Sequence, residues 1–450
     1  MIRLRNLLSA AAVLALAAPA NAQQSAPTGN IPVESYKLPN GLTVVLSEDH
    51  TTPVVAVDVW YHVGSRNERP GRSGFAHLFE HMMFQGSENV GKAEHLQLVE
   101  RAGGSMNGST NEDRTNYFET LPANRLNLGL WLEADRMRSL AITPENVENQ
   151  REVVKEERRL RIDNSPYGSS FLAISYEVPY SQSCYAYNHS VIGSMDDLNA
   201  AQIPDVQQFF DTYYAPNNAV LTVVGDFDPA QAKQLVEEYF GDIPAGPAPD
   251  PVQCSEPFSH LPVSRTIEDN NATVPAYFAA YGIPSVESPD QYPIALLAEA
   301  LGSGESSRLY QRLVQQEKVA TAVQSFADIR KGPGVFITFA IPNQGVTTDR
   351  IASLIDDEIA RIRRDGITAA ELEKVKNRYR AREVLGRQTV LGKAEALQSA
   401  TYFAGGPEAI NTELQKYLAV NRADLKRVAD QYLTPQNRAV VITQPAGGQE

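Results

Sequence analysis

Two segments 219 residues apart resemble each other, and this repeat limits the possible folds more than any other feature of the chain. The run "DTYYAPNNAVLTVVGDF", from Asp211, resembles "DQYLTPQNRAVVITQPA", from Asp430. The same offset places "FAHLFEHM", from Phe75, over "IALLAEAL", from Ile294. Agreement at both ends of the offset indicates a duplicated unit, so two related domains are expected.

The order of patterns within each copy indicates the fold class. A turn signal at Asn40 and Gly41 precedes β-rich runs at 42–47 and 54–63, and a helical pattern begins at Asp228. Strands and helices mix without regular alternation along the chain. This favours an α+β fold in which helices cover one mostly antiparallel sheet in each domain.

Composition divides the chain into five parts. Residues 1–22 have the basic start, apolar run and small-residue end of a cleaved signal peptide, and a short mature tail (23–31) follows. A proline-dense stretch at 246–265 is expected to link an N-terminal domain (32–245) to a C-terminal domain (266–450). The apolar run is too short to cross a membrane, so we expect a periplasmic or secreted protein without a membrane span; an uncleaved anchor is the alternative.

Charge and cysteine content exclude several function classes. Without residues 1–22 the chain keeps 38 basic and 54 acidic residues, a net charge of −16. Such a surface disfavours nucleic acids and anionic lipids. No other cysteine or nearby histidine completes a zinc set with Cys184 and Cys254, so these two are expected to form a disulfide or to remain as unpaired thiols, without a catalytic role.

The run "FAHLFEHM" combines two histidines and a glutamate at helical spacing. His77 and His81 are four residues apart and share a helix face, so both imidazoles can reach one zinc ion. Glu80 lies on the same side, where it can take a proton from water that the ion has made acidic. H-x-x-E-H reverses the better-known H-E-x-x-H order and supports the same chemistry. In the second copy Leu296 and Ala300 replace the histidines, so only the first copy is expected to hold metal.

A third protein ligand must come from elsewhere, because catalytic zinc usually has three. The segment 146–162 is strongly helical in composition and offers Glu152, Glu156 and Glu157. Spacing alone does not choose among them. The alternative to a zinc site is a partly buried helix that carries two histidines by coincidence.

Four motifs together resemble the pitrilysin/insulinase family of zinc metallopeptidases, in particular the short two-domain subunits similar to mitochondrial processing peptidase. They are "GRSGFAHLFEHMMFQGS", "REVVKEERR" about 75 residues later, "GGSMNGSTNEDRTNYFETLP" (103–122) and "HSVIGSMDDL" (189–198). The resemblance runs from about residue 32 to the C-terminal "YLTPQNRAVVITQP" and is looser in the second half.

The resemblance implies a specific set of site residues. Zinc, one ion per chain, would be held by His77, His81 and Glu157, with Glu80 as the general base and Glu156 as the second choice for the third ligand. Many family members carry a further supporting glutamate seven residues before that ligand, where this chain has Gln150.

The resemblance also implies how a peptide would bind. An edge strand would pair with the backbone of the substrate through the residues Asn107, Gly108, Ser109 and Thr110. An ordinary hairpin is the alternative for this segment.

Family enzymes complete their site with an arginine and a tyrosine seven residues apart, and this chain departs from that pattern. The two positions fall on Val314 and Thr321, although Arg308, Tyr310 and Arg312 lie nearby. The chain therefore resembles one half of a clam-shaped chamber that needs a second homologous subunit.

These features together predict a zinc-dependent endopeptidase that hydrolyses small proteins or peptides as the catalytic subunit of a heterodimer. Two alternatives remain. One is a non-catalytic scaffold or binding subunit of the same fold, and the other is a self-sufficient homodimeric peptidase.

Overall fold

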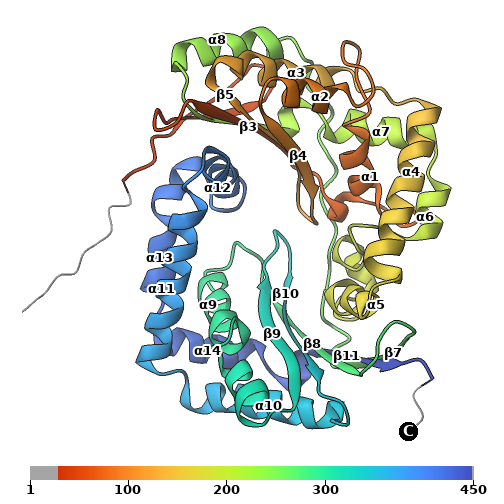
Figure 1. Ribbon diagram of the computed structural model, residues 1–450, viewed down its shortest axis with the longest axis vertical. Helices are drawn as coiled ribbons and strands as arrows, with labels where there is room; N and C mark the ends of the chain where they lie inside the picture. Colours follow the sequence, from red (N-terminus) through yellow and green to blue (C-terminus); the bar gives the residue numbers. More distant parts are fainter. Residues whose placement is uncertain (1–28, 448–450) are drawn as a thin grey trace, which may run out of the picture. The chain divides into compact units, whose positions relative to one another are not determined.

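Two sheets organise the part of the chain that the computed structural model describes, residues 29–447 (Figure 1). The signal peptide expected over 1–22 lies outside these residues. The first sheet has the order β1-β2-β6-β3-β5-β4, with β1 Glu34–Lys37, β2 Thr43–Glu48, β3 Val54–Tyr61, β4 Ser105–Thr110, β5 Thr115–Pro122 and β6 Ala219–Gly225. The second has the order β7-β11-β8-β10-β9, with β7 Val263–Asp269, β8 Ala276–Ile283, β9 Ala320–Asp328, β10 Gly334–Pro342 and β11 Arg438–Pro445. Each sheet contains one parallel pair, β2 with β6 and β7 with β11, and is otherwise antiparallel.

The helices divide between the two copies. The first copy contains α1 Phe75–Met82, α2 Glu94–Arg101, α3 Leu126–Arg138, α4 Pro144–Arg158, α5 Gly168–Leu172, α6 Met195–Ala200, α7 Ile203–Tyr213 and α8 Pro229–Phe240. The second contains α9 Gln291–Gly302, α10 Thr348–Asp365, α11 Ala369–Gly386, α12 Val390–Phe403, α13 Glu413–Ala419 and α14 Arg422–Tyr432. Among the described helices, none is both long and apolar enough to span a bilayer.

Equivalent elements recur at the predicted offset. The segment from α7 through a short 3-10 turn into β6 repeats as α14, a 3-10 turn and β11. Even one side-chain bond repeats: the amide of Asn218 donates to the carbonyl of Tyr213, and that of Asn437 donates to Tyr432, both at 2.9 Å. The predicted α+β fold of two duplicated units is confirmed.

Both faces of the first sheet are covered at β3, where every residue from Val55 to Tyr61 is buried, the polar Asp58 included. Val57 and its alternate neighbours face the core beneath the helices of the first copy. Ala56, on the opposite face, packs against α12 of the second copy, the helix that lies below β3 in Figure 1. The buried Gln398 of α12 donates to the carbonyls of Asp58 and Val220, at 2.8 and 2.9 Å. The second copy therefore completes the core of the first.

The segment between the two sheets is irregular. Residues 241–262 contain no strand or α-helix, and β7 begins at Val263, inside the linker expected at 246–265. Cys254 lies in this segment and forms a disulfide with the buried Cys184. Of the two states expected for these cysteines, the structure has the disulfide.

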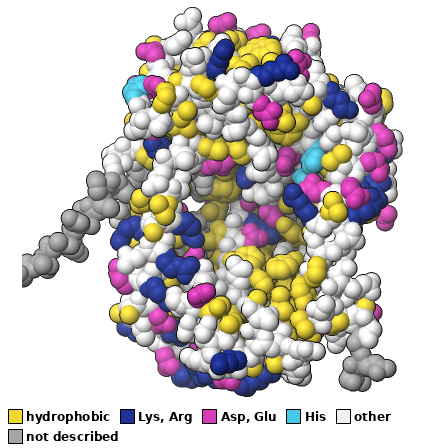
Figure 2. All heavy atoms as spheres, in the orientation of Figure 1, with side chains coloured by type: hydrophobic (Ala, Val, Ile, Leu, Met, Phe, Trp, Pro, Cys, Tyr) yellow, Lys and Arg dark blue, Asp and Glu magenta, His cyan; other side chains and the backbone are white. Residues whose placement is uncertain are grey.

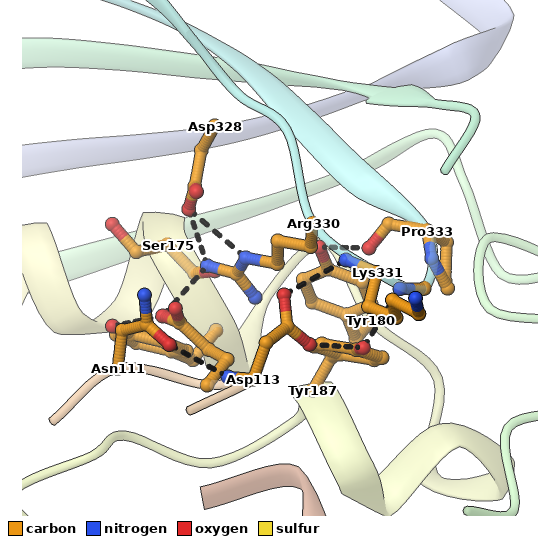
Figure 3. Close-up of polar contacts among 12 residues, drawn as sticks. Asn111, Asp113, Ser175, Tyr180, Tyr187, Asp328, Arg330, Lys331 and Pro333 are labelled. Carbon is orange, nitrogen blue, oxygen red and sulfur yellow. Dashed lines mark hydrogen bonds and ion pairs between the residues drawn. The ribbon is translucent and has the colours of Figure 1, made fainter. Parts of the chain in front are cut away.

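A buried arginine joins the two copies beside the turn between β4 and β5 (Figure 3). Arg330 follows β9, and its side chain is 1% exposed. It donates to Asp328 and to the carbonyl of Ser175, and it lies 3.3 Å from Glu112 in the first copy. The guanidinium also lies 5.0–5.6 Å from the ring centres of Tyr176, Tyr180 and Tyr187. Its charge is thus compensated from both copies.

Asp113 supplies the second half of this junction (Figure 3). Its carboxylate accepts the hydroxyl of Tyr187 at 2.9 Å and the backbone N–H of Lys331 at 2.8 Å. The loop after β9 is therefore bonded directly to the turn that follows β4.

Replacing Arg330 tests this junction. Arg330→Met leaves Glu112 and Asp328 without their shared cation in a buried site, which is expected to lower the free energy of unfolding by about 3–5 kcal/mol. Urea unfolding followed by circular dichroism measures the change. Arg364→Met, at an exposed arginine paired with Asp365, is the control and should leave the midpoint unchanged. An unchanged midpoint for Arg330→Met contradicts the junction's role.

A histidine makes the contact between the copies sensitive to pH. His62 follows β3, and its ring stacks on Tyr402 of α12 with ring centres 4.2 Å apart. Burial lowers the pKa of His62 to about 4, and the nearby charges of Lys331 and Arg66 act in the same direction. The unfolded chain, with a histidine pKa near 6.5, binds the proton first, so this contribution to stability is lost as pH falls from about 6.5 through 4.

His62→Phe keeps the stacking and removes the titration. Between pH 7.5 and 5 the variant is expected to lose roughly 2 kcal/mol less unfolding free energy than the wild type. Urea unfolding at the two pH values gives both differences. Equal losses in the two proteins would show that His62 does not couple folding to pH.

Candidate metal centre

The helix α1 presents three polar side chains on one side because its apolar residues occupy the other. Phe75, Leu78, Phe79 and Met82 are buried at the helical spacing i, i+3, i+4 and i+7. Gly74 precedes the helix with a positive φ of 87°, a conformation that favours glycine. His77, Glu80 and His81 consequently face away from the core.

The helices α1 and α4 lie side by side and bring three ligand atoms together (Figure 1). Oε2 of Glu157 lies 3.6 Å from Nε2 of His77 and 3.3 Å from Nε2 of His81. The two imidazole rings are nearly perpendicular, with centres 4.9 Å apart.

The other two glutamates considered as the third ligand pair with basic side chains three residues further along the chain. Glu152 accepts from Lys155 at 2.7 Å, and Glu156 accepts from Arg159 at 3.0 Å. Of the three candidates, Glu157 is the one that meets the histidines.

The spacing of these atoms fits zinc. Ligands bound tetrahedrally at 2.0–2.1 Å are about 3.3–3.4 Å apart, close to both distances to Glu157. The three side chains are 12–22% exposed, so an ion there could be reached from solvent. Burial lowers the pKa of His77 to about 4, which keeps its imidazole in the neutral form that binds metal. Two imidazoles and one carboxylate leave the fourth position that a catalytic zinc site requires.

Glu80 is held between α1 and β4. Its Oε2 accepts the hydroxyl of Thr110 at 2.7 Å. Gly108 makes room for it, since a Cβ at that position would lie 3.3 Å from Cγ of Glu80. Burial raises the pKa of Glu80. A carboxylate with a raised pKa and a fixed orientation suits reversible proton transfer.

The strand expected to bind substrate lies at one edge of the first sheet within the described residues. The strand β4 pairs with β5 on one side and contains all four residues proposed from the sequence: Asn107, Gly108, Ser109 and Thr110. The carbonyl and hydroxyl of Ser109 both accept from Arg114. Thr110 uses its hydroxyl to hold Glu80, a contact that sequence reasoning did not anticipate.

A second partner of Glu157 was also missed. Arg161 lies 2.9 Å from Oε1 of Glu157 and belongs to a π-helical turn, Arg159–Asp163, that follows α4. The i, i+4 spacing of the pair is the signal that could have found it. Gln150 donates its amide to Asn149.

The second copy has arginines around the equivalent helix. Glu299 of α9, the counterpart of Glu80, is bound by Arg382 at 2.6 Å and lies 3.6 Å from Arg378. Leu296 and Ala300 are buried where the histidines would stand. In the second copy, Arg378 and Arg382 therefore compensate the charge of Glu299, where the first copy has the two histidines beside Glu80.

Another group of potential ligands lies in the first copy, where ligand atoms of His95, Glu119 and Glu133 are within 4.8 Å of one another. All three are buried, and Arg136 donates to both carboxylate oxygens of Glu133. Burial raises the pKa of Glu119 to about 7 and that of Glu133 to about 8. A bound proton and the charge of Arg136 together compensate the negative charge of the two glutamates. We therefore do not assign a metal to this group.

Comparison with known proteins identifies the family. The model of "Insulinase (Peptidase family M16)" matches residues 43–166, and that of "Peptidase M16 inactive domain" matches residues 200–379. The zinc protease PqqE of Helicobacter pylori is 31% identical over 445 residues, which cover 97% of this chain and 98% of that protein. The chain belongs to peptidase family M16. The resemblance predicted from the motifs is confirmed.

Other similar proteins extend the comparison. An uncharacterized zinc protease of Mycobacterium leprae, ML0855, is 27% identical over 90% of both chains. The crystal structure of a protease from Helicobacter pylori has a TM-score of 0.88 and 29% identity, covering 93% of this chain and all of that one. The periplasmic protease PqqL from Escherichia coli shares the fold (TM-score 0.72, 20% identity); the match covers 92% of this chain and 47% of PqqL.

Proposed function

We propose that this chain is a zinc-dependent endopeptidase that hydrolyses peptide bonds in small proteins or peptides. The observation that carries the proposal is the convergence of His77, His81 and Glu157 at the spacing of zinc ligands, with Glu80 one residue before His81. Its place in family M16, whose relatives are named zinc proteases, supports it. Export to the periplasm or beyond is part of the proposal.

The mechanism assigns one task to each side chain. When bound, zinc supplies Lewis acidity, which polarises a peptide carbonyl and makes water more acidic. His77, His81 and Glu157 would hold the ion. Glu80 accepts a proton from the attacking water and returns it to the leaving nitrogen, and its raised pKa lets it hold that proton between the two steps. Thr110 keeps the carboxylate oriented for both transfers.

The strand β4 would hold the substrate extended. A peptide that pairs with its free edge gains backbone hydrogen bonds along Asn107–Thr110, next to Glu80. Backbone hydrogen bonds do not depend on the side chains of the substrate, so this pairing gives little sequence specificity. Acidic and basic side chains are interspersed over the face of the molecule in Figure 2, so that face offers no simple charge preference.

Glu80→Gln separates catalysis from metal binding. The variant keeps the three proposed ligands but cannot accept the proton, so we expect zinc content to stay near one ion per chain and cleavage to fall by about 10²–10⁴-fold. Elemental analysis and a fluorogenic peptide assay measure the two quantities. Glu152→Gln, on the exposed part of α4, is the control and should retain full activity. Full activity of Glu80→Gln would refute the assigned base.

We propose further that a second homologous subunit supplies the missing arginine and tyrosine. The two expected positions hold Val314, in the π-helical segment Tyr310–Gln316, and Thr321, in β9. The arginines nearby are already paired with acids of the second copy (Arg308 with Glu371 at 2.6 Å, Arg312 with Glu317 at 3.0 Å). Neither pair leaves a free cation to replace the missing group.

Activity of the purified chain alone distinguishes the remaining alternatives. A catalytic subunit of a heterodimer is expected to bind about one zinc ion and to cleave a peptide library only after a homologous subunit that carries the Arg/Tyr pair is added. Cleavage by the chain alone supports a self-sufficient homodimer. Absence of zinc in the purified chain supports a scaffold and contradicts the proposed enzyme.

A further inference from the structure

The start of α1 is held by a buried carboxylate outside the H-x-x-E-H motif. Oε2 of Glu68 accepts the backbone N–H of Gly74 at 2.9 Å, and Oε1 accepts that of Ala76 at 2.8 Å. The side chain of Glu68 is fully buried. The first N–H groups of a helix have no partner within it, and the helix dipole favours an anion there. Glu68 thus satisfies two of these groups immediately before His77.

A histidine from the segment 189–198 fixes Glu68 in turn. Nε2 of His189 lies 2.9 Å from Oε2 of Glu68 and 2.9 Å from the carbonyl of Ser65. Nδ1 lies 2.6 Å from the carbonyl of Tyr185. Both ring nitrogens face acceptors, so both donate only when the imidazole is protonated. Burial opposes that charge, yet the hydrogen bond to Glu68 raises the pKa of His189.

The rest of the segment 189–198 packs on the same helix end. A Cβ on Gly193 would lie 2.5 Å from Cα of Gly74, so the two backbones touch where both residues have positive φ. Asp197 accepts both the N–H and the hydroxyl of Ser73. The motif "HSVIGSMDDL", which the proposed catalytic steps do not use, therefore lies against the helix that carries His77 and His81.

We propose that Glu68 and His189 are positioning residues for the metal centre, a buried ion pair that orients the first turn of α1. The inference rests on the proposed function, since it assigns the pair a role in holding zinc. The helix α1 has eight residues, too few to be stable by itself, so its contacts determine its direction. Glu68 bonds Ala76, the residue before His77, so a shift of the pair moves the imidazole of His77 relative to Glu157.

Zinc affinity tests this role directly. Competition with a chromophoric chelator gives the zinc dissociation constant of the wild type, Glu68→Gln, His189→Leu and His189→Gln. We expect Glu68→Gln and His189→Leu to weaken zinc binding by about 10–100-fold, as other losses of supporting partners do. His189→Gln should restore most of the affinity, because its amide can donate to Glu68.

A matched control separates positioning from general stability. Asp290 precedes α9, the counterpart of α1 in the second copy, and is bound by Arg427 and Tyr432. Asp290→Asn is expected to lower the urea midpoint of the zinc-free protein and to leave zinc affinity unchanged. If Glu68→Gln and His189→Leu behave like Asp290→Asn, the positioning role is overturned.

Three further outcomes remain distinguishable. If His189→Leu does not fold, Glu68→Gln decides the question, because it preserves the size of the side chain and one acceptor. A wild-type chain that binds no zinc overturns both this inference and the proposed function. A wild-type chain that binds zinc but cleaves nothing, even with a homologous subunit, overturns the proposed function, and the affinities of the variants still support or overturn the positioning role.

Discussion

The meeting of α1 and α4 at His77, His81 and Glu157 is the interaction on which the rest of the site depends. Two imidazole nitrogens and a carboxylate oxygen converge on one point. Acceptors crowded in this way repel one another unless a cation or a proton lies between them. An ion held by all three would relieve that conflict and leave one position for a reacting group.

The duplicated copy shows that the scaffold does not require this centre. The helix α9 keeps a buried apolar face, with Leu296 and Ala300 at the positions of the histidines. Arginines compensate Glu299 there. The proposed metal centre thus lies in one copy of a unit that also folds without it. Glu68 bonds the start of α1 and lies against His189, Thr110 bonds Glu80, and Arg161 pairs with Glu157.

Much of the fold followed from local patterns. The repeat at 219 residues anticipated two equivalent sheets, and Asp228 begins a helix as expected, since its side chain accepts from the N–H of Gln231. The spacing of H-x-x-E-H anticipated that His77 and His81 share a face. The two helix predictions succeeded because helical periodicity and capping act within a few residues of the chain, whereas the repeat is found by comparing the chain with itself.

Contacts between distant segments could not be predicted in the same way. The choice of Glu157 among three glutamates depends on how α4 lies against α1, and the family resemblance made that choice where spacing could not. Glu68 meets His189 more than 100 residues away in sequence, and Arg330 meets Glu112 across the two copies. Neither pair carries a periodic signal.

Zinc K-edge X-ray absorption of the purified chain tests the central claim most directly. The account predicts a first shell that contains two histidine nitrogens and one carboxylate oxygen at about 2.0–2.1 Å. It also predicts that Glu157→Gln loses the oxygen ligand. A first shell that Glu157→Gln leaves unchanged would contradict it.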